Sequence, residues 1–414
     1  MDRRLLIVII LFLVFLITFI SIIYINEINN MQELRIEYPE LKEEVFSYRK
    51  DNLKVWIINM ALSFAIPLIF LVSGLSQRIS FLTGKDRNLF IAGLLYGLVF
   101  FGLVFIIRLP LNFYSSFILR HRYGLTDQTL LRWIELSLKG FVVNDLIFSL
   151  FLWLPYYIIY NSPKSWWIKI GLLLIPIVVF VVFISPMLID PIFNEYTSIE
   201  DEELGQEIQV LLDKAGVGDA AIFSVDKSKD TNTMNAYMTG IFRSKRIVIW
   251  DTTINNLSED ETLAITAHEI GHYVKGHIWI GIIISCLGNL IILNILYIMS
   301  NWVLRLSNGA FGFRNLYNYA SVPLFIFLLN FLLLLSNPIA SYVSRTMEFQ
   351  ADRYEVSLTR DRQSAVTAME KLYDTNLGIP RPSNIYRIWY YTHPPLEERI
   401  EHYRSVDFEE IGDR

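Results

Sequence analysis

Seven apolar stretches, separated by polar segments, dominate the pattern along this chain. A transmembrane helix needs about 20 mostly apolar residues. The fourth stretch has the weakest pattern, since Asp145 stands near its start and Pro155 lies inside it. The pattern predicts a polytopic α-helical membrane protein with about seven transmembrane helices. The stretches lie near residues 5–25, 55–75, 88–108, 142–160, 166–187, 278–299 and 318–338.

The first apolar stretch is interpreted as a retained span rather than a cleaved signal peptide. It begins after Arg4 and continues to Ile25, which is longer than the apolar region of most signal peptides. The residues that follow, 26–30, read Asn-Glu-Ile-Asn-Asn and do not resemble the small-residue motif at which signal peptides are cut.

The composition also favours a membrane protein over two or three soluble domains. Of 414 residues, 53% are hydrophobic and only 19% are charged. The net charge of -5 provides no basic surface for nucleic acid, so no nucleic-acid partner is expected. The single cysteine, Cys286, lies in an apolar stretch, and an intrachain disulfide is therefore impossible.

Basic residues in the loops predict the orientation in the bilayer. The loops at 26–54 and 109–141 are rich in Lys and Arg, whereas those at 76–87, 161–165 and 300–317 carry fewer. Basic loops tend to stay in the cytoplasm. Because the segment 188–277 and the tail after residue 339 fall on the basic side, we expect both to face the cytoplasm. The membrane would be the plasma (inner) membrane in a prokaryote or the endoplasmic reticulum in a eukaryote.

The long polar segment at 188–277 predicts a small folded unit. Residues 201–215 form an amphipathic helical pattern that ends at Gly216 and Gly218. Three short β-rich runs follow, at 220–225, 235–240 and 246–250. We expect these runs to form a small antiparallel sheet. An edge strand of such a sheet can bind a substrate peptide as an added strand.

A helix that carries an H-E-x-x-H motif follows the predicted sheet. Ser258 and Glu261 have the spacing of a capping box, and nothing breaks the helix before Gly271. His268 and His272 are one turn apart and therefore project from the same face. Two neutral imidazoles placed in this way can hold two corners of a zinc tetrahedron.

Glu269 has a different position on this helix and a different predicted role. It is rotated by roughly 100° from His268, so it cannot be a third ligand but can reach a water on the metal. Zinc lowers the pKa of such a water toward about 7, and a neighbouring carboxylate can take the proton. The motif therefore predicts a zinc hydrolase with Glu269 as general base. The alternative is a chance match on an amphipathic helix, against which the regular helix start argues.

A catalytic zinc site needs a third protein ligand and an open position. The seventh apolar stretch returns the chain to the same membrane face, where Glu348 and Asp352 lie one helical turn apart. Glu348 can ligate the metal while Asp352 accepts a hydrogen bond from a ligand histidine. The alternative is a solvated acidic face, with Arg345 and Arg353 as ion-pair partners.

Together these motifs resemble the type I CAAX prenyl proteases, which are integral-membrane zinc endopeptidases. The resemblance rests on His268-Glu269-x-x-His272 and on Ser344-Arg345-x-x-Glu348-Phe349-x-Ala351-Asp352, and it covers nearly the whole chain. Other segments agree: Arg122-Tyr123-Gly124-Leu125, Ile189-Asp190-Pro191-Ile192-Phe193-Asn194, Asn235-Ala236-Tyr237, Ser244-Lys245-Arg246-Ile247-Val248, His393-Pro394-Pro395 and Glu398-Arg399-Ile400.

The resemblance implies a set of site residues. One Zn²⁺ ion per chain would be held by His268, His272 and Glu348, at the cytoplasmic end of a water-filled chamber enclosed by seven spans. The catalytic domain would be zincin-like, of the gluzincin type. His393 would lie near the zinc, where it can stabilise the oxyanion, and Asn235 would lie on the edge strand that binds substrate.

The sequence thus predicts a membrane zinc endopeptidase that resembles enzymes removing the C-terminal tripeptide of prenylated CAAX proteins. Its partners would be the lipid bilayer and a peptide or protein substrate, with or without a prenyl group. One alternative is a quality-control protease without prenyl specificity. Another is a transporter or scaffold with structural zinc, which would need a closed four-ligand site. The predicted regions are transmembrane helices one to five (1–187), a catalytic region (188–277), helices six and seven (278–338) and a C-terminal catalytic region (339–414).

Overall fold

A computed structural model describes residues 3–406, so the outermost ends of the first and last predicted regions lie outside the described residues. Within that range, seven helical stretches are long and apolar enough to cross a membrane, which confirms the predicted number and order. They are Arg3–Glu37, Glu43–Val72, Leu89–Arg122, Leu130–Asn161, Trp166–Ile192, His277–Ser307 and Tyr319–Thr359.

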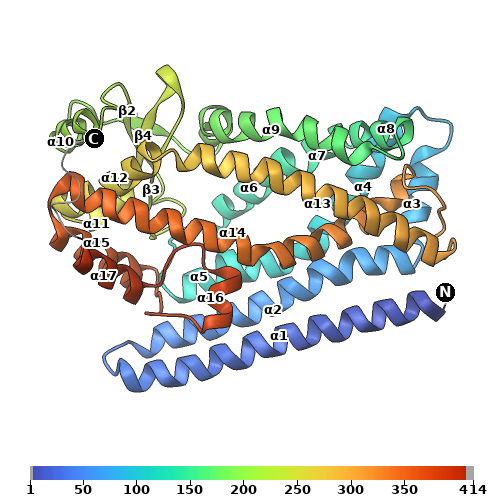
Figure 1. Cartoon of the computed structure of the whole chain (residues 1–414), viewed down its shortest axis with the longest axis horizontal. Coiled ribbons are helices and arrows are strands. Elements are labelled where there is room, and N and C mark those ends of the chain that lie inside the picture. Colours follow the sequence, from blue (N-terminus) through green and yellow to red (C-terminus); the bar gives the residue numbers. More distant parts are fainter. Residues whose placement is uncertain (1–2, 407–414) are drawn as a thin grey trace.

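The molecule is elongated, and its long helices run between two ends (Figure 1). The N-terminus, α3 and α8 lie at one end, and the small sheet lies at the other with α10, α12, α15 and α17 (Figure 1). The membrane helices are α1 (Arg3–Glu37), α2 (Glu43–Val72), α4 (Leu89–Phe113), η1 (Tyr114–Ile118), α5 (Leu119–Arg122), α6 (Leu130–Gly140), η2 (Phe141–Leu146), α7 (Ile147–Phe151), α8 (Trp153–Asn161), α9 (Trp166–Leu188), α13 (His277–Ser307) and α14 (Val322–Thr359).

Three segments predicted as loops are largely helical. The short helix α3 (Leu75–Gly84) occupies most of 76–87, and helices extend into 109–141 and into 26–54 from both sides. Hydropathy indicates where a helix leaves the apolar layer, but the helix continues until a cap or turn ends it. In the second segment that turn lies just after Arg122, where Gly124 has φ 65°.

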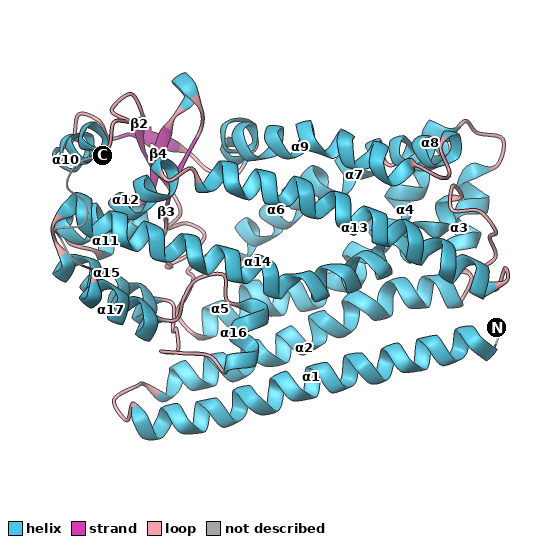
Figure 2. Cartoon of the chain, viewed as in Figure 1, coloured by secondary structure: helices cyan, strands magenta, loops and turns pink. Residues whose placement is uncertain are grey.

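The sheet has four strands in the order β1 (Tyr196–Ser198), β2 (Ala221–Val225), β4 (Arg246–Trp250), β3 (Ala236–Thr239). The three predicted strands are present, but the predicted antiparallel arrangement is wrong because β2 and β4 are parallel. The chain passes from β2 to the outer position of β3 and returns through η4 (Phe242–Ser244) into β4, so β4 rather than β3 lies beside β2. β3 therefore forms one edge of the sheet (Figure 2).

The helix α12 (Glu259–Val274) packs against this sheet through a core that includes Ile222, Ile247 and Ile270. The predicted capping box is confirmed: Ser258 Oγ accepts from the Glu261 amide, and a Glu261 carboxylate oxygen accepts from the Ser258 amide. The remaining elements at this end are η3 (Asp190–Ile192), α10 (Glu203–Lys214), α11 (Asp251–Asn256), α15 (Arg362–Thr375), α16 (Asn384–Tyr390) and α17 (Leu396–Ser405), and η5 (Tyr319–Ser321) precedes α14.

The long helix α14 extends beyond the membrane stretch and lies beside α12 (Figure 1). Gly271 permits this close approach, since a Cβ at that position would lie 3.1 Å from the Tyr354 side chain and 3.3 Å from Ala351 Cα. The packing of α14 on α12 places its acidic residues opposite the histidines of the H-E-x-x-H motif.

Candidate active site

The structure brings together the three predicted metal ligands. His268 Nε2 and His272 Nε2 are 3.1 Å apart. The Glu348 carboxylate lies 3.4 Å from His268 Nε2 and 3.3 Å from His272 Nε2. Two turns of α12 and one of α14 thus direct three ligand atoms at one point, all within 4.8 Å of one another. Two imidazoles and a carboxylate are a donor set that suits zinc.

An unsatisfied oxygen indicates that these residues fit a cation. Glu348 is 5% exposed, and its Oε2 forms no hydrogen bond with any residue in 3–406. A buried carboxylate oxygen without a partner is costly, and native structures rarely tolerate one. A metal ion bound between Glu348 and the two histidines would remove that cost.

Asp352 is buried behind His268 rather than exposed on a solvated face. Its Oδ1 lies 3.0 Å from His268 Nδ1, which matches the predicted orienting contact. Arg399 Nε donates to Asp352 Oδ2 at 3.0 Å, and the Tyr403 hydroxyl oxygen lies 2.9 Å from Asp352 Oδ1. The solvated-face alternative is therefore wrong. Arg345, its suggested ion-pair partner, instead donates to the backbone oxygens of residues 387 and 391.

A second acidic cluster, formed by His268, Asp352 and Glu355, is geometrically close enough to hold a metal. Tyr403 donates to Glu355 Oε2 at 2.7 Å, and Arg399 already pairs with Asp352. A guanidinium therefore provides the positive charge in this cluster. Sequence reasoning missed Glu355, Arg399 and Tyr403 as site residues. Glu355 could have been found, because it lies on the same helical face as Asp352.

Two neutral side chains, His277 and Gln350, form a row of hydrogen bonds that ends at His272. Its Nδ1 lies 2.9 Å from His277 Nδ1, and His277 Nε2 lies 2.9 Å from Gln350 Oε1. The amide oxygen can only accept, so His277 Nε2 carries a hydrogen and its Nδ1 accepts from His272. That arrangement leaves His272 Nε2 free of hydrogen and able to ligate. His277, which the sequence had not linked to the site, begins α13 after a left-handed turn at Gly276, φ 70°.

We expect His277→Ala to weaken zinc binding by about 10- to 100-fold, as loss of a contact behind a metal ligand commonly does. His277→Asn should recover much of the affinity, since its side-chain oxygen can accept in place of Nδ1. Competition titration against a zinc chelator measures both. His121→Ala is the control, because His121 is exposed and lies against Phe117, at its backbone carbonyl and its ring. Equal affinity for the wild type and His277→Ala would contradict the assignment.

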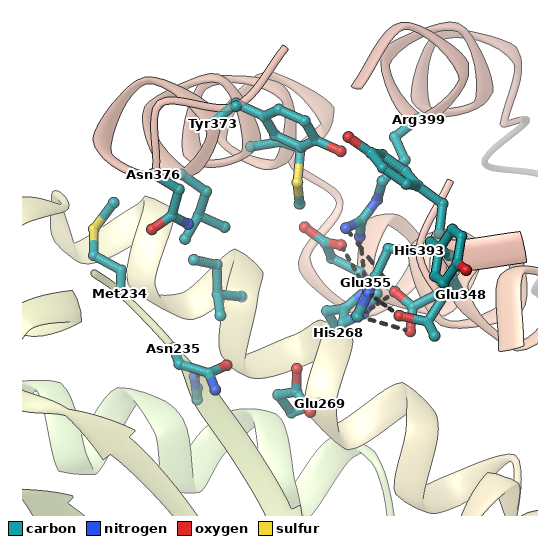
Figure 3. A pocket seen from close by; sticks show the side chains of 18 residues that line it. Met234, Asn235, His268, Glu269, Glu348, Glu355, Tyr373, Asn376, His393 and Arg399 are labelled. Atoms are coloured by element: carbon teal, nitrogen blue, oxygen red, sulfur yellow. Dashed lines mark hydrogen bonds and ion pairs between the residues drawn. The ribbon is translucent and has the colours of Figure 1, made fainter. Parts of the chain in front are cut away.

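The candidate site opens into a cavity of about 410 Å³ whose lining includes Asn235, Glu269 and His393. Figure 3 shows the side chains of these residues directed into the same cavity from the residue before β3, from α12 and from the segment before α17. Glu269 is not one of the three converging ligands, as its rotation on the helix predicted. Burial raises the pKa of Glu269 above the usual range for a glutamate. A raised pKa suits a group that must take and return a proton near neutral pH.

His393 and Asn235 approach the ligands from opposite walls of the cavity. His393 Nε2 lies 3.4 Å from Glu348 Oε1, with 61% of the His393 side chain exposed. Asn235 precedes the edge strand, and its Oδ1 accepts from the Ala236 amide at 2.9 Å. The Asn235 side-chain NH₂ has no hydrogen bond within residues 3–406, so it is available to a ligand in the cavity.

The segment that carries His393 is tied to the first two membrane helices. Glu27 on α1 is fully buried and accepts from Arg49 on α2 at 2.7 Å and from the Ser383 hydroxyl at 2.7 Å. Ser383 begins the α16 segment, which leads to His393. Because Glu27 and Ser383 are far apart in the sequence, this anchor could not be predicted from local patterns.

Comparison with known proteins identifies the family of the chain. Residues 198–407 match the profile of peptidase family M48, and residues 39–195 match the profile described as "CAAX prenyl protease N-terminal, five membrane helices". The chain belongs to peptidase family M48. It is similar to CAAX prenyl protease 1 of Saccharomyces cerevisiae, with 32% identity over 365 residues, 84% of this chain and 77% of the relative.

Two further relatives cover most of this M48 peptidase. The "Uncharacterized metalloprotease YhfN" of Bacillus subtilis is 31% identical over 352 residues, which are 84% of this chain and 82% of the relative. The crystal structure of S. mikatae Ste24p superposes with a TM-score of 0.81 and 27% identity, covering 94% of this chain and 97% of that chain. These comparisons confirm the predicted fold class and the prediction of a membrane zinc endopeptidase, and they favour it over a transporter or scaffold.

Proposed function

We propose that His268, His272 and Glu348 hold one Zn²⁺ ion and that the protein cleaves peptide bonds in the cavity beside them. The observation that carries this proposal is the convergence of three ligand atoms within 4.8 Å, one residue of which, Glu348, has a buried carboxylate oxygen that accepts no hydrogen bond in residues 3–406. The predicted catalytic regions, 188–277 and 339–414, both contribute to this site. The proposed membrane regions, 1–187 and 278–338, hold these two catalytic regions at the bilayer.

Each residue has a separate chemical task. When bound, the ion supplies Lewis acidity toward the scissile carbonyl and the attacking water. Glu269 takes a proton from that water and passes it to the leaving amine. His393, which lies beside Glu348, donates a hydrogen bond to the developing oxyanion. The backbone of β3 pairs with the substrate as an added strand, and the NH₂ of Asn235 donates to the substrate backbone.

The proposed substrates are proteins that end in a CAAX motif, with the C-terminal tripeptide as the product. The yeast relative is named a CAAX prenyl protease, which supports this substrate class. Purified protein should be incubated with a prenylated CAAX peptide, an unprenylated copy and a scrambled C-terminus, each with and without chelator. We expect chelator-sensitive release of the tripeptide that is fastest for the prenylated peptide. Equal cleavage of all three would favour the quality-control alternative.

We propose that the active site faces the cytoplasm. The basic loops and the catalytic end lie at one end of the molecule, opposite α3 (Figure 1). Cysteines at two exposed positions, Lys85→Cys near α3 and Lys214→Cys on α10, test this in a Cys286→Ser background. On intact cells expressing the protein in the plasma membrane, a membrane-impermeant maleimide should label the first and leave the second unlabelled until the cells are permeabilised. The opposite pattern would place the active site outside.

A further inference from the structure

A second cavity adjoins the active-site cavity at the start of the edge strand. Its volume is about 420 Å³, and Asn235 lines both cavities. Tyr237 and Trp250 line it from the face of the sheet opposite α12, and Asn194 closes it from the segment that follows η3. A peptide that passes Asn235 in the active site can therefore extend into this space.

Hydrogen-bond donors without partners face this second cavity. Within residues 3–406, Lys227 Nζ makes no ion pair or hydrogen bond, and it lies 5.3 Å from the centre of the Trp250 ring. Trp250 Nε1 is buried without a partner, and the Asn194 amide oxygen is likewise unpaired although Asn194 is only 7% exposed. The NH₂ of Asn194 also has no hydrogen bond in the described residues. Lys227 Nζ can therefore pair with an anionic group, and the unpartnered donors of Trp250 and Asn194 belong to residues that line the same cavity.

The acidic residues of the cavity do not neutralise Lys227 by contact. Asp230 is bound by Arg132 Nε at 2.8 Å and by Gln128 at 3.1 Å. Among residues 3–406, the Asp190 carboxylate accepts a hydrogen bond only from the Tyr196 hydroxyl, at 3.5 Å. Burial lowers the pKa of Lys227, although the charges of Asp230, Asp190 and Asp226 act in the opposite direction. A bound anion would supply the missing partner.

The direction of the edge strand indicates which end of a peptide reaches this cavity. A strand added to β3 in the more stable antiparallel sense runs opposite to Ala236–Thr239. Its N-terminal part lies along β3, and its C-terminal part passes Asn235 toward the loop at 226–235. The group arriving there is a C-terminal carboxylate. A cation and two further donors match that group, whereas they would repel the ammonium of an N-terminus.

We propose that this second cavity binds the free C-terminal carboxylate of the peptide substrate, with Lys227 as its cationic partner and Trp250 and Asn194 as additional donors. The inference rests on the proposed function, because it assigns to that site a preference for substrates cut close to their C-terminus.

Two peptides that differ only in ending with a carboxylate or a carboxamide test this inference on the full-length protein. We expect the wild type to cleave the carboxylate peptide with a kcat/KM about 10-fold or more above that of the carboxamide, the effect of one charge-assisted hydrogen bond. Lys227→Met should reduce the rate on the carboxylate peptide to the level of the carboxamide. Lys227→Arg should restore most of the preference, which a merely structural role of Lys227 would not predict.

Lys229→Met is the matched control, because Lys229 pairs with Asp226 and does not line the cavity. It should keep the wild-type ratio between the two peptides. Equal wild-type rates on both peptides, or an equal loss on both in Lys227→Met, would overturn the inference while leaving the protease function intact. Failure to cleave either peptide in the presence of zinc would instead count against the proposed function.

Discussion

Glu269→Gln is expected to retain one zinc ion per chain and to lose about 10²- to 10⁴-fold in kcat, the usual contribution of a general base. The variant removes the base without touching a ligand, since Glu269 lines the cavity but lies outside the group formed by His268, His272 and Glu348. Metal content by atomic absorption and turnover of a CAAX peptide should be measured on the same preparation.

Glu259→Gln serves as the control for this experiment. Glu259 begins the same helix but is exposed and remote from the cavity, so both metal content and turnover should match the wild type. If Glu269→Gln lost its metal together with its activity, the role assigned to Glu269 would be wrong. Full activity in that variant would exclude it as the base.

The second large effect is expected in metal binding, and it should distinguish the role of Glu348 from that of Asp352. Glu348→Ala removes a ligand and should be nearly free of metal. Asp352→Asn removes the negative charge that His268 and Arg399 share but keeps a side chain of similar size, so it should bind zinc about 10- to 100-fold more weakly and keep slow peptide cleavage. Zinc titration with a competing chelator gives both affinities. A metal-free Asp352→Asn beside a zinc-loaded Glu348→Ala would exchange the two roles.

The choice of asparagine at position 352 follows from the structure. Asp352 is fully buried and pairs with Arg399, which is also buried. An alanine there would leave the guanidinium without its partner, a change that commonly costs about 3–5 kcal/mol of stability. Thermal unfolding should therefore be recorded for each variant, so that loss of metal can be told apart from loss of the fold.

Local patterns were sufficient to predict much of this protein. Spans follow from runs of apolar residues, because the bilayer requires about 20 of them. The capping box of Ser258 and Glu261, and the shared face of His268 and His272, follow from helix geometry alone. The combined motifs also pointed to the protease family that the comparisons confirmed. These features depend on residues a few positions apart, and a single sequence displays them directly.

The sheet shows where local patterns became insufficient. Its three longer strands were predicted, yet their order and the parallel pairing of β2 with β4 were not. Strand propensity depends on each segment's own residues, whereas pairing depends on the route that the chain takes between segments. The same limit applied to the loops at 76–87 and 109–141, where hydropathy could not show how far the helices continue.

By itself, therefore, the sequence determined the membrane class, the metal-binding motif and the candidates for base and third ligand. Only the tertiary structure decided which side chains surround them. Gly271 lets α14 approach α12, and Arg399, from a distant helix, reaches Asp352. Gln350 orients His277 behind His272 in the same way. Contacts of this kind arise because packing joins elements far apart in the chain, and no period or cap in the local sequence records them.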